Sequence, residues 1–172
     1  MAAEWWEDRR EEGLALERAE AGVPVQSLDG TLVLSLTRAA RLFTTQLNDE
    51  LLLAGLTGPQ WLALHEVVRE RSIEPGEIAR HLGVARPTAS EVLARLIAQR
   101  LVTREQAYLD GRLRVYLATD SGVRAAVRGA AGAARATARA TDGFTPAERA
   151  QLVVLLERVV DSLAGLRPGL QP

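Results

Sequence analysis

Two short helices joined by a glycine turn constrain this sequence more than any other feature. The first helix is expected to begin at Glu74-Pro75 and to stop at Gly83. A second start follows at once in Arg86-Pro87-Thr88, where proline suits the first turn because early N–H groups have no partner in the helix. The apolar positions of the second helix recur at three- and four-residue steps: Ala89, Val92, Leu93, Leu96 and Ile97.

Behind the second helix the apolar period changes from 3.6 to 2. Leu101-Val102 begins an extended stretch, and Asp110-Gly111 is a strong hairpin turn signal. After the turn, Leu113, Val115 and Leu117 alternate with polar or aromatic residues. The sequence therefore predicts a small β-hairpin, or wing, behind a helix-turn-helix pair.

Helical patterns flank this winged segment on both sides. We expect an acidic helix at about residues 4–21, a helix at about 28–53, and a helix beginning at Thr57-Gly58-Pro59. Asp120-Ser121-Gly122 is expected to cap an alanine- and glycine-rich helix up to about residue 141, and Thr145 opens the last helix with a capping box. The fold class is therefore mostly α with a small β-hairpin wing, and 172 residues suffice for its core.

The residue inventory argues against catalysis and against a metal site. The chain has no cysteine, and its two histidines, His65 and His81, fall on different expected helices. No glycine-rich phosphate-binding loop is present. We therefore expect no enzyme activity, no catalytic residue, no metal and no cofactor. The acidic N-terminus is unlike a signal peptide and no apolar run could span a bilayer, so we expect a cytoplasmic protein without a membrane partner.

The charge distribution of the winged segment suits double-stranded DNA. Residues 86–114 carry six arginines against three acidic residues, a net charge of +3. The second helix of such a pair fits the major groove, and a basic wing can enter a flanking minor groove. The candidate DNA-binding residues on the helix and the wing are Arg86, Pro87, Thr88, Ser90, Glu91, Arg95, Asp110, Arg112 and Arg114.

Glu91 is the unusual member of this set, because a carboxylate repels phosphate. It could accept a hydrogen bond from a cytosine amino group. It could instead pair with Arg95 four residues later in the same helix, which we favour.

The sequence resembles the MarR family of transcriptional regulators. The resemblance covers about residues 28–166 and is carried by an ordered set of segments: Leu56-Thr57-Gly58-Pro59-Gln60-Trp61-Leu62-Ala63-Leu64, residues 78–90, Arg95-Leu96, Leu101-Val102 and Asp110-Gly111-Arg112. It implies an obligate homodimer whose first and last helices interlock. It also implies that Arg86, Thr88 and Ser90 lie on the recognition helix, that Asp110 braces the wing and that Arg112 contacts DNA.

The sequence departs from the family pattern at four places. Ala85 stands where serine is usual, so an N-cap is missing, and Arg100 stands where glycine suits a left-handed conformation. Glu91 replaces a frequent arginine, and Ala118-Thr119 replaces leucine-threonine.

Many relatives bind small aromatic or anionic molecules between the dimerisation helices and the winged domain. Here Trp61, His65 and Arg69 recur at i, i+4 and i+8 and face partly towards the helix of Ser35 and Arg38. These five residues are the candidate ligand-binding set. The alternative is that Trp61 belongs to the core and Arg69 is a solvated helix end.

The N-terminal extension with Trp5 and Trp6 is similar to the urate-responsive branch of the family. That branch usually has an acidic residue directly after the tryptophan of the second helix, where this chain has Leu62. Packing of Trp5 and Trp6 against the dimer body is the alternative.

Together these patterns predict a ligand-responsive DNA-binding regulator, a repressor that binds a palindromic operator as a homodimer. We expect an N-terminal helical extension at 1–27, a helical dimerisation region at 28–56 and 120–168, and a winged DNA-binding domain at 57–119. The alternative is a winged-helix dimerisation or protein-interaction module that has lost DNA binding. Ala85, Glu91 and the acidic N-terminus motivate this alternative.

Overall fold

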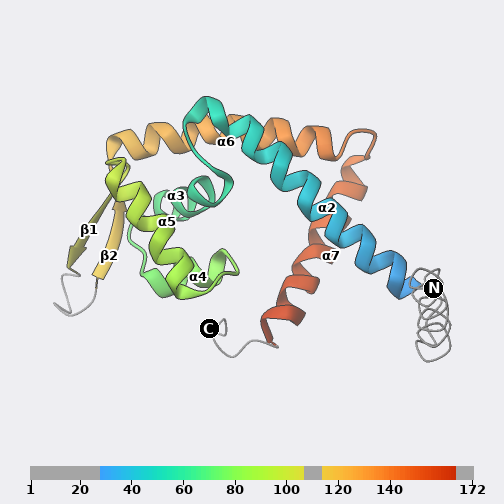
Figure 1. Ribbon diagram of the computed structural model, residues 1–172. Coiled ribbons are helices and arrows are strands. Elements are labelled where there is room, and N and C mark those ends of the chain that lie inside the picture. The colour runs from blue at the N-terminus through green and yellow to red at the C-terminus, as the bar shows by residue number, and fades with distance from the viewer. Residues whose placement is uncertain (1–27, 107–113, 166–172) are drawn as a thin grey trace, which may run out of the picture. The chain divides into compact units, whose positions relative to one another are not determined.

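The computed structural model describes residues 28–106 and 114–165 (Figure 1). The chain divides into two compact units, residues 1–42 and residues 43–172. The described part of the first unit is the beginning of α2 (Leu28–Leu51), a helix that continues into the second unit. The helix expected at 4–21 lies outside the described residues.

In its described residues the second unit is mostly helical with an antiparallel hairpin, which confirms the predicted fold class. After α2 the chain forms a short 3₁₀ turn where we had expected α-helix up to residue 53. The remaining elements follow in this order: η1 (Leu52–Ala54), α3 (Gly58–Glu70), α4 (Pro75–His81), α5 (Arg86–Ala98), β1 (Val102–Gln106), β2 (Arg114–Ala118), α6 (Asp120–Ala140) and α7 (Pro146–Gly165).

The core of the second unit joins the three helices α3, α4 and α5 to the hairpin. Apolar side chains from all of them are buried in one cluster, which includes Leu64, Ile78, Leu93, Leu96 and Val102. The predicted inward face of α5 is confirmed except at its end, where Ile97 is 37% exposed.

Local hydrogen bonds explain where most of these helices begin. The hydroxyl of Thr57 accepts from the backbone N–H of Gln60, whose side chain accepts from the N–H of Thr57, so the predicted start of α3 is confirmed. Ala85 provides no side-chain cap for α5, as expected. The cap of α6 differs from the prediction: Thr119, rather than Asp120 or its neighbours, accepts from the N–H of Gly122.

A third extended segment connects the hairpin to the helices through backbone hydrogen bonds. β1 and β2 pair from Val102 opposite Ala118 to Gln106 opposite Arg114. Ile73, in the connection between α3 and α4, exchanges two backbone hydrogen bonds with Tyr116 of β2. The base of the wing is therefore fixed, and the turn at Asp110-Gly111 lies outside the described residues.

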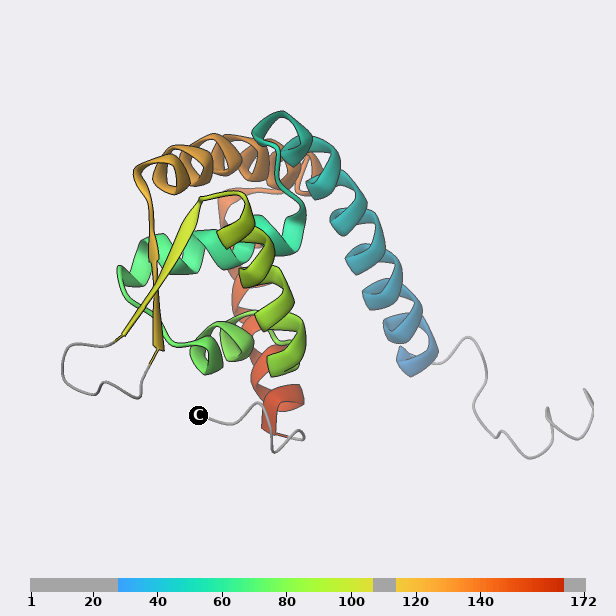
Figure 2. The ribbon, with the colours of Figure 1, turned by 60° about the vertical axis from the view of Figure 1, so that its left-hand side comes forward.

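α6 runs along α3 and reaches the hairpin at its N-terminal end (Figures 1 and 2). Its glycines allow very close approach, because a Cβ at Gly129 would lie 2.1 Å from Cδ1 of Trp61 and one at Gly122 would lie 2.0 Å from the carbonyl oxygen of Leu101. The indole Nε1–H of Trp61 donates to the backbone oxygen of Ala126 over 3.2 Å. The small residues of α6 therefore allow α3 and the segment before β1 to pack closely against this helix.

The last helix, α7, begins with the capping box that the sequence predicts. The N–H of Glu148 donates to the hydroxyl of Thr145, and the carboxylate of Glu148 accepts from the N–H of Thr145 over 2.7 Å. These hydrogen bonds from Thr145 lower the pKa of Glu148. Among the described residues, no helix has the length and apolar character needed to cross a membrane.

Candidate nucleic-acid interface

α5 presents one polar, exposed face and one buried apolar face. Ala89, Val92, Leu93 and Leu96 point into the core formed with α3 and α4. All the α5 residues that the sequence analysis selected are exposed and share the opposite side: Arg86, Pro87, Thr88, Ser90, Glu91 and Arg95. The face is therefore free in this chain to meet a large partner such as the edge of a duplex.

The N-terminal turn of α5 is suited to a phosphate group. Its first N–H groups have no side-chain cap, and Thr88 and Ser90 add hydroxyl donors in the same turn. The guanidinium of Arg86 lies beside Gly76, 3.8 Å from the position that a Cβ would take there. This places a positive charge at the junction between the start of α4 and the start of α5.

Glu91 and Arg95 do not form the ion pair that we favoured. Neither side chain has a salt bridge or a hydrogen bond to the other within the described residues, although both are exposed on α5. An exposed i,i+4 pair is worth only about 0.2–0.5 kcal/mol, which is less than thermal energy, so side-chain entropy outweighs it. The carboxylate of Glu91 is consequently available on the same face as the hydroxyls.

The wing contributes further basic side chains. Arg114 begins β2 opposite Gln106, and it is exposed as expected. Arg104, an exposed residue of β1 opposite Tyr116, was missed by the sequence analysis. Strand alternation places it on the same face as buried Val102, so periodicity alone could not have marked it as exposed. The predicted wing pair of Asp110 and Arg112 lies outside the described residues.

The predicted ligand-binding residues are distributed over both units. Ser35 and Arg38 are exposed positions of α2 in the first unit. In the second unit, Trp61 packs against α6 and against the buried core, as the alternative interpretation expected. The ring of His65 lies 5.4 Å from the indole at a tilt of 45°, and His65 itself is exposed.

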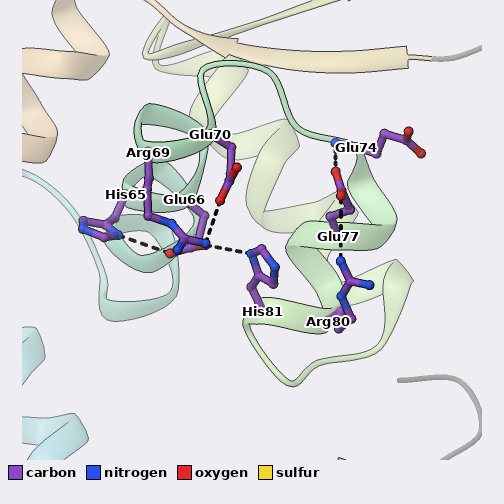
Figure 3. Close-up of polar contacts among 8 residues, drawn as sticks. All are labelled: His65, Glu66, Arg69, Glu70, Glu74, Glu77, Arg80 and His81. Atoms are coloured by element: carbon purple, nitrogen blue, oxygen red, sulfur yellow. Dashed lines mark hydrogen bonds and ion pairs between the residues drawn. The ribbon is translucent and has the colours of Figure 1, made fainter. Parts of the chain in front are cut away.

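Glu66 organises the charged side chains around this part of α3 (Figure 3). Its carboxylate lies 2.6 Å from Nη2 of Arg69, which also lies 2.8 Å from Glu70. It further contacts Nδ1 of His65 at 3.3 Å and Nδ1 of His81 at 2.7 Å. Partial burial raises the pKa of Glu66, but the hydrogen bonds from the two histidines and the charge of Arg69 outweigh burial, so this pKa is lowered. The sequence analysis did not select Glu66.

The structure contains no built metal centre in its described part. No group of three or more histidine and acidic side chains there could hold a metal ion, and the chain has no cysteine.

The three helices, the hairpin behind them and the exposed polar face of α5 define a winged helix-turn-helix protein. Residues 54–113 match the model of the MarR family. The chain is similar to the MarR family through this segment, which spans less than half of its length.

Solved structures of regulators share this fold over most of their length. The transcriptional regulator PcaV from Streptomyces coelicolor, in complex with its natural ligand, is 26% identical, with 83% of this chain and 98% of that chain covered and a TM-score of 0.68. A mutant MarR from E. coli, complexed with operator DNA, is 22% identical, with 75% and 93% covered and a TM-score of 0.69. CouR from Rhodococcus jostii, bound to p-coumaroyl-CoA, is 20% identical, with 78% and 95% covered and a TM-score of 0.71. No curated protein matches the sequence significantly.

Proposed function

We propose that this chain is a cytoplasmic repressor that binds a palindromic operator as a homodimer and responds to a small molecule. The observation that carries the proposal is the exposed polar face of α5, which leaves Arg86, Thr88, Ser90 and Arg95 free beside a buried apolar side. In this proposal α5 lies in the major groove. The wing, with Arg104, Arg112 and Arg114, contacts the flanking backbone or minor groove.

The homodimer is supported by the apolar surface of α7. A wide stripe of its large apolar side chains is exposed in the single chain, although monomeric proteins rarely expose such a surface. A second copy of the chain is the occupant we propose, and two copies would present two α5 helices to successive major grooves, about 34–36 Å apart. The exposed side chains are Val153, Val154, Leu155, Leu156, Val159, Val160 and Leu163.

The DNA-binding part of the proposal is tested by selection from a random or genomic duplex library with the purified full chain. At about 100 mM salt we expect a palindrome to be enriched, and we expect affinity to fall steeply with added salt because arginine–phosphate contacts release counterions. Enrichment of no palindrome, together with no retention on heparin, would replace this proposal by the interaction-module alternative. The unpaired carboxylate of Glu91 on the polar face of α5 is the observation that favours that alternative.

We further propose that the effector is a small aromatic or anionic molecule bound near α3, where Trp61, His65 and Arg69 lie. Among the similar structures, CouR is bound to p-coumaroyl-CoA, PcaV is in complex with its natural ligand, and the DNA binding of BpsR from Bordetella bronchiseptica is regulated by 6-hydroxynicotinic acid. A thermal-shift screen that compares neutral aromatic compounds with aromatic acids tests the class. An effector must raise the melting temperature of the full chain and release bound operator, and His65→Ala must weaken that response.

A further inference from the structure

Both histidines of the chain contact the same carboxylate. The chain has two histidines, and Nδ1 of each lies within hydrogen-bond distance of Glu66, at 3.3 Å for His65 and 2.7 Å for His81 (Figure 3). Both imidazole rings of the protein therefore contact one carboxylate. Glu66 is also only partly accessible, with 17% of its side chain exposed.

The identity of the acceptor fixes the proton on each ring. The lowered pKa of Glu66 keeps it ionised at neutral pH, and an ionised carboxylate can only accept hydrogen bonds. Nδ1 of His65 and Nδ1 of His81 must therefore each carry a proton, either in the Nδ1–H tautomer or in the imidazolium form.

The two contacts differ in what they connect. His65 precedes Glu66 in α3, so their contact stays within one helix. His81 is the last residue of α4 and lies 15 positions from Glu66, so its contact ties α4 to α3. Two residues further on, Gly83 adopts a φ of 64° and turns the chain into α5. The contact between His81 and Glu66 therefore lies next to the turn that leads from α4 into α5.

We propose that Glu66 is a positioning residue that holds the helix-turn-helix pair against α3 through His81, and that protonation of this imidazole tightens the hold as pH falls. The inference deepens the proposed DNA-binding function and rests on it for its effect on operator affinity. Imidazoles gain their proton between about pH 8 and pH 5. Over the upper part of that range Glu66 stays ionised, so the 2.7 Å contact changes from a neutral hydrogen bond to an ion pair.

Among the described residues, Glu66 is the charged group that contacts the imidazole of His81. On α3, Arg69 shares the carboxylate of Glu66 and is itself paired with Glu70. On α4, Glu77 faces Arg80 at 3.8 Å. The charged side chains of the described parts of α5 and β2, which also pack against α4, have no hydrogen bond or ion pair with the cluster: Arg86, Glu91, Arg95 and Arg114.

The first test measures the stability of the full chain by urea unfolding from pH 8 to pH 5.5, without DNA. For the wild type we expect the folding equilibrium constant to rise as pH falls, by about two- to five-fold more than in His81→Gln, as for a partly exposed ion pair. His65→Gln is the matched control, because it removes an imidazole from the same carboxylate without cutting the link between helices. A pH profile of His81→Gln parallel to that of the wild type, or an equal loss in His65→Gln, would overturn the proposal.

The second test reads the proton directly from the nitrogen and carbon resonances of the imidazole rings. With only two histidines, single substitutions assign both sets of signals. At pH 8 we expect the Nδ1–H tautomer for His81 in the wild type and its loss in Glu66→Gln. The Nε2–H tautomer for His81 in the folded wild type would contradict the geometry.

The third test measures the effect of the contact between His81 and Glu66 on operator affinity. At constant ionic strength, operator affinity of the wild type should increase on going from pH 8 to pH 5.5 by about two- to five-fold relative to His81→Gln. Equal pH dependence of the two proteins would refute the link to α5. If no duplex binds to any variant, the proposed function fails, and the two measurements without DNA still decide whether the tie exists.

Discussion

Replacing Gly129 with alanine has two opposite effects on stability: it improves the helix propensity of α6 and it disturbs the packing of α6 against α3. Alanine is the better helix former by about 1 kcal/mol, so propensity alone predicts a more stable protein. The structure predicts the opposite, because the new Cβ would lie 2.1 Å from Cδ1 of Trp61 and 2.5 Å from its Nε1. Since carbon atoms in contact stay about 3.5–4.0 Å apart, the indole would have to retreat from α6.

The size of the effect follows from what that retreat breaks. The hydrogen bond from Nε1 of Trp61 to the oxygen of Ala126 would be lost, which costs about 0.5–1.5 kcal/mol. Overpacking of a close helix contact costs about 1–3 kcal/mol more. After the gain of about 1 kcal/mol in propensity, the net expectation is a loss of about 0.5–3.5 kcal/mol in the free energy of unfolding.

Urea unfolding of the full chain, followed by circular dichroism, measures this loss. Ala130→Gly is the matched control on the exposed side of the same helix, and it should lower stability by about 1 kcal/mol through propensity alone. In a Trp61→Leu background the smaller side chain leaves room, so Gly129→Ala should become neutral or stabilising. A stabilised Gly129→Ala protein, or an equal loss with and without Trp61, would refute the reasoning.

Three further predictions follow from single residues. Arg100 has a φ of 58°, so Arg100→Gly should raise the free energy of unfolding by about 0.5–1 kcal/mol in urea, and a decrease would show that the arginine side chain stabilises the fold. Arg114→Ala should weaken binding to all duplexes by a similar factor and reduce the salt slope by about 1 in anisotropy titrations, whereas a change at one base position alone would indicate base readout. The lowered pKa of Glu66 stabilises the folded state above its ordinary value of 4.5, so acid unfolding of the wild type should be steeper below that pH than for Glu66→Gln, and equal slopes would contradict the contact geometry.

The elements that could be predicted from the sequence are those specified by neighbouring residues. The start of α3 needs only Thr57 and Gln60, three positions apart, and both hydrogen bonds form. The turns at Gly55 and Gly83 likewise need only a residue that tolerates positive φ, and both adopt it. Even Arg100, where the family pattern has glycine, takes the same conformation. The surrounding fold therefore imposes the backbone angle there, whichever residue is present.

Correct spacing alone did not predict the ion pair between Glu91 and Arg95. The sequence placed both residues four positions apart, but the energy of such a pair is too small to hold two exposed side chains together.

Contacts between distant segments could not be predicted from local patterns at all. Nothing in the local pattern links Glu66 to His81, because their contact depends on how the connection between α3 and α4 folds back. The Ile73 bridge to Tyr116, which fixes that connection to the wing, is equally non-local.

The same distinction decides how an effector could use α3. Spacing alone put Trp61, His65 and Arg69 on one face of the helix, yet their availability depends on residues from elsewhere in the fold. The indole N–H already donates to α6, and the guanidinium of Arg69 already lies between two carboxylates. A carboxylate of an effector at Arg69 would have to displace Glu66 or Glu70, which are held there without any loss of translational freedom. An aromatic acid must therefore gain most of its affinity from apolar contact, and a neutral aromatic compound of the same shape should bind at least as well.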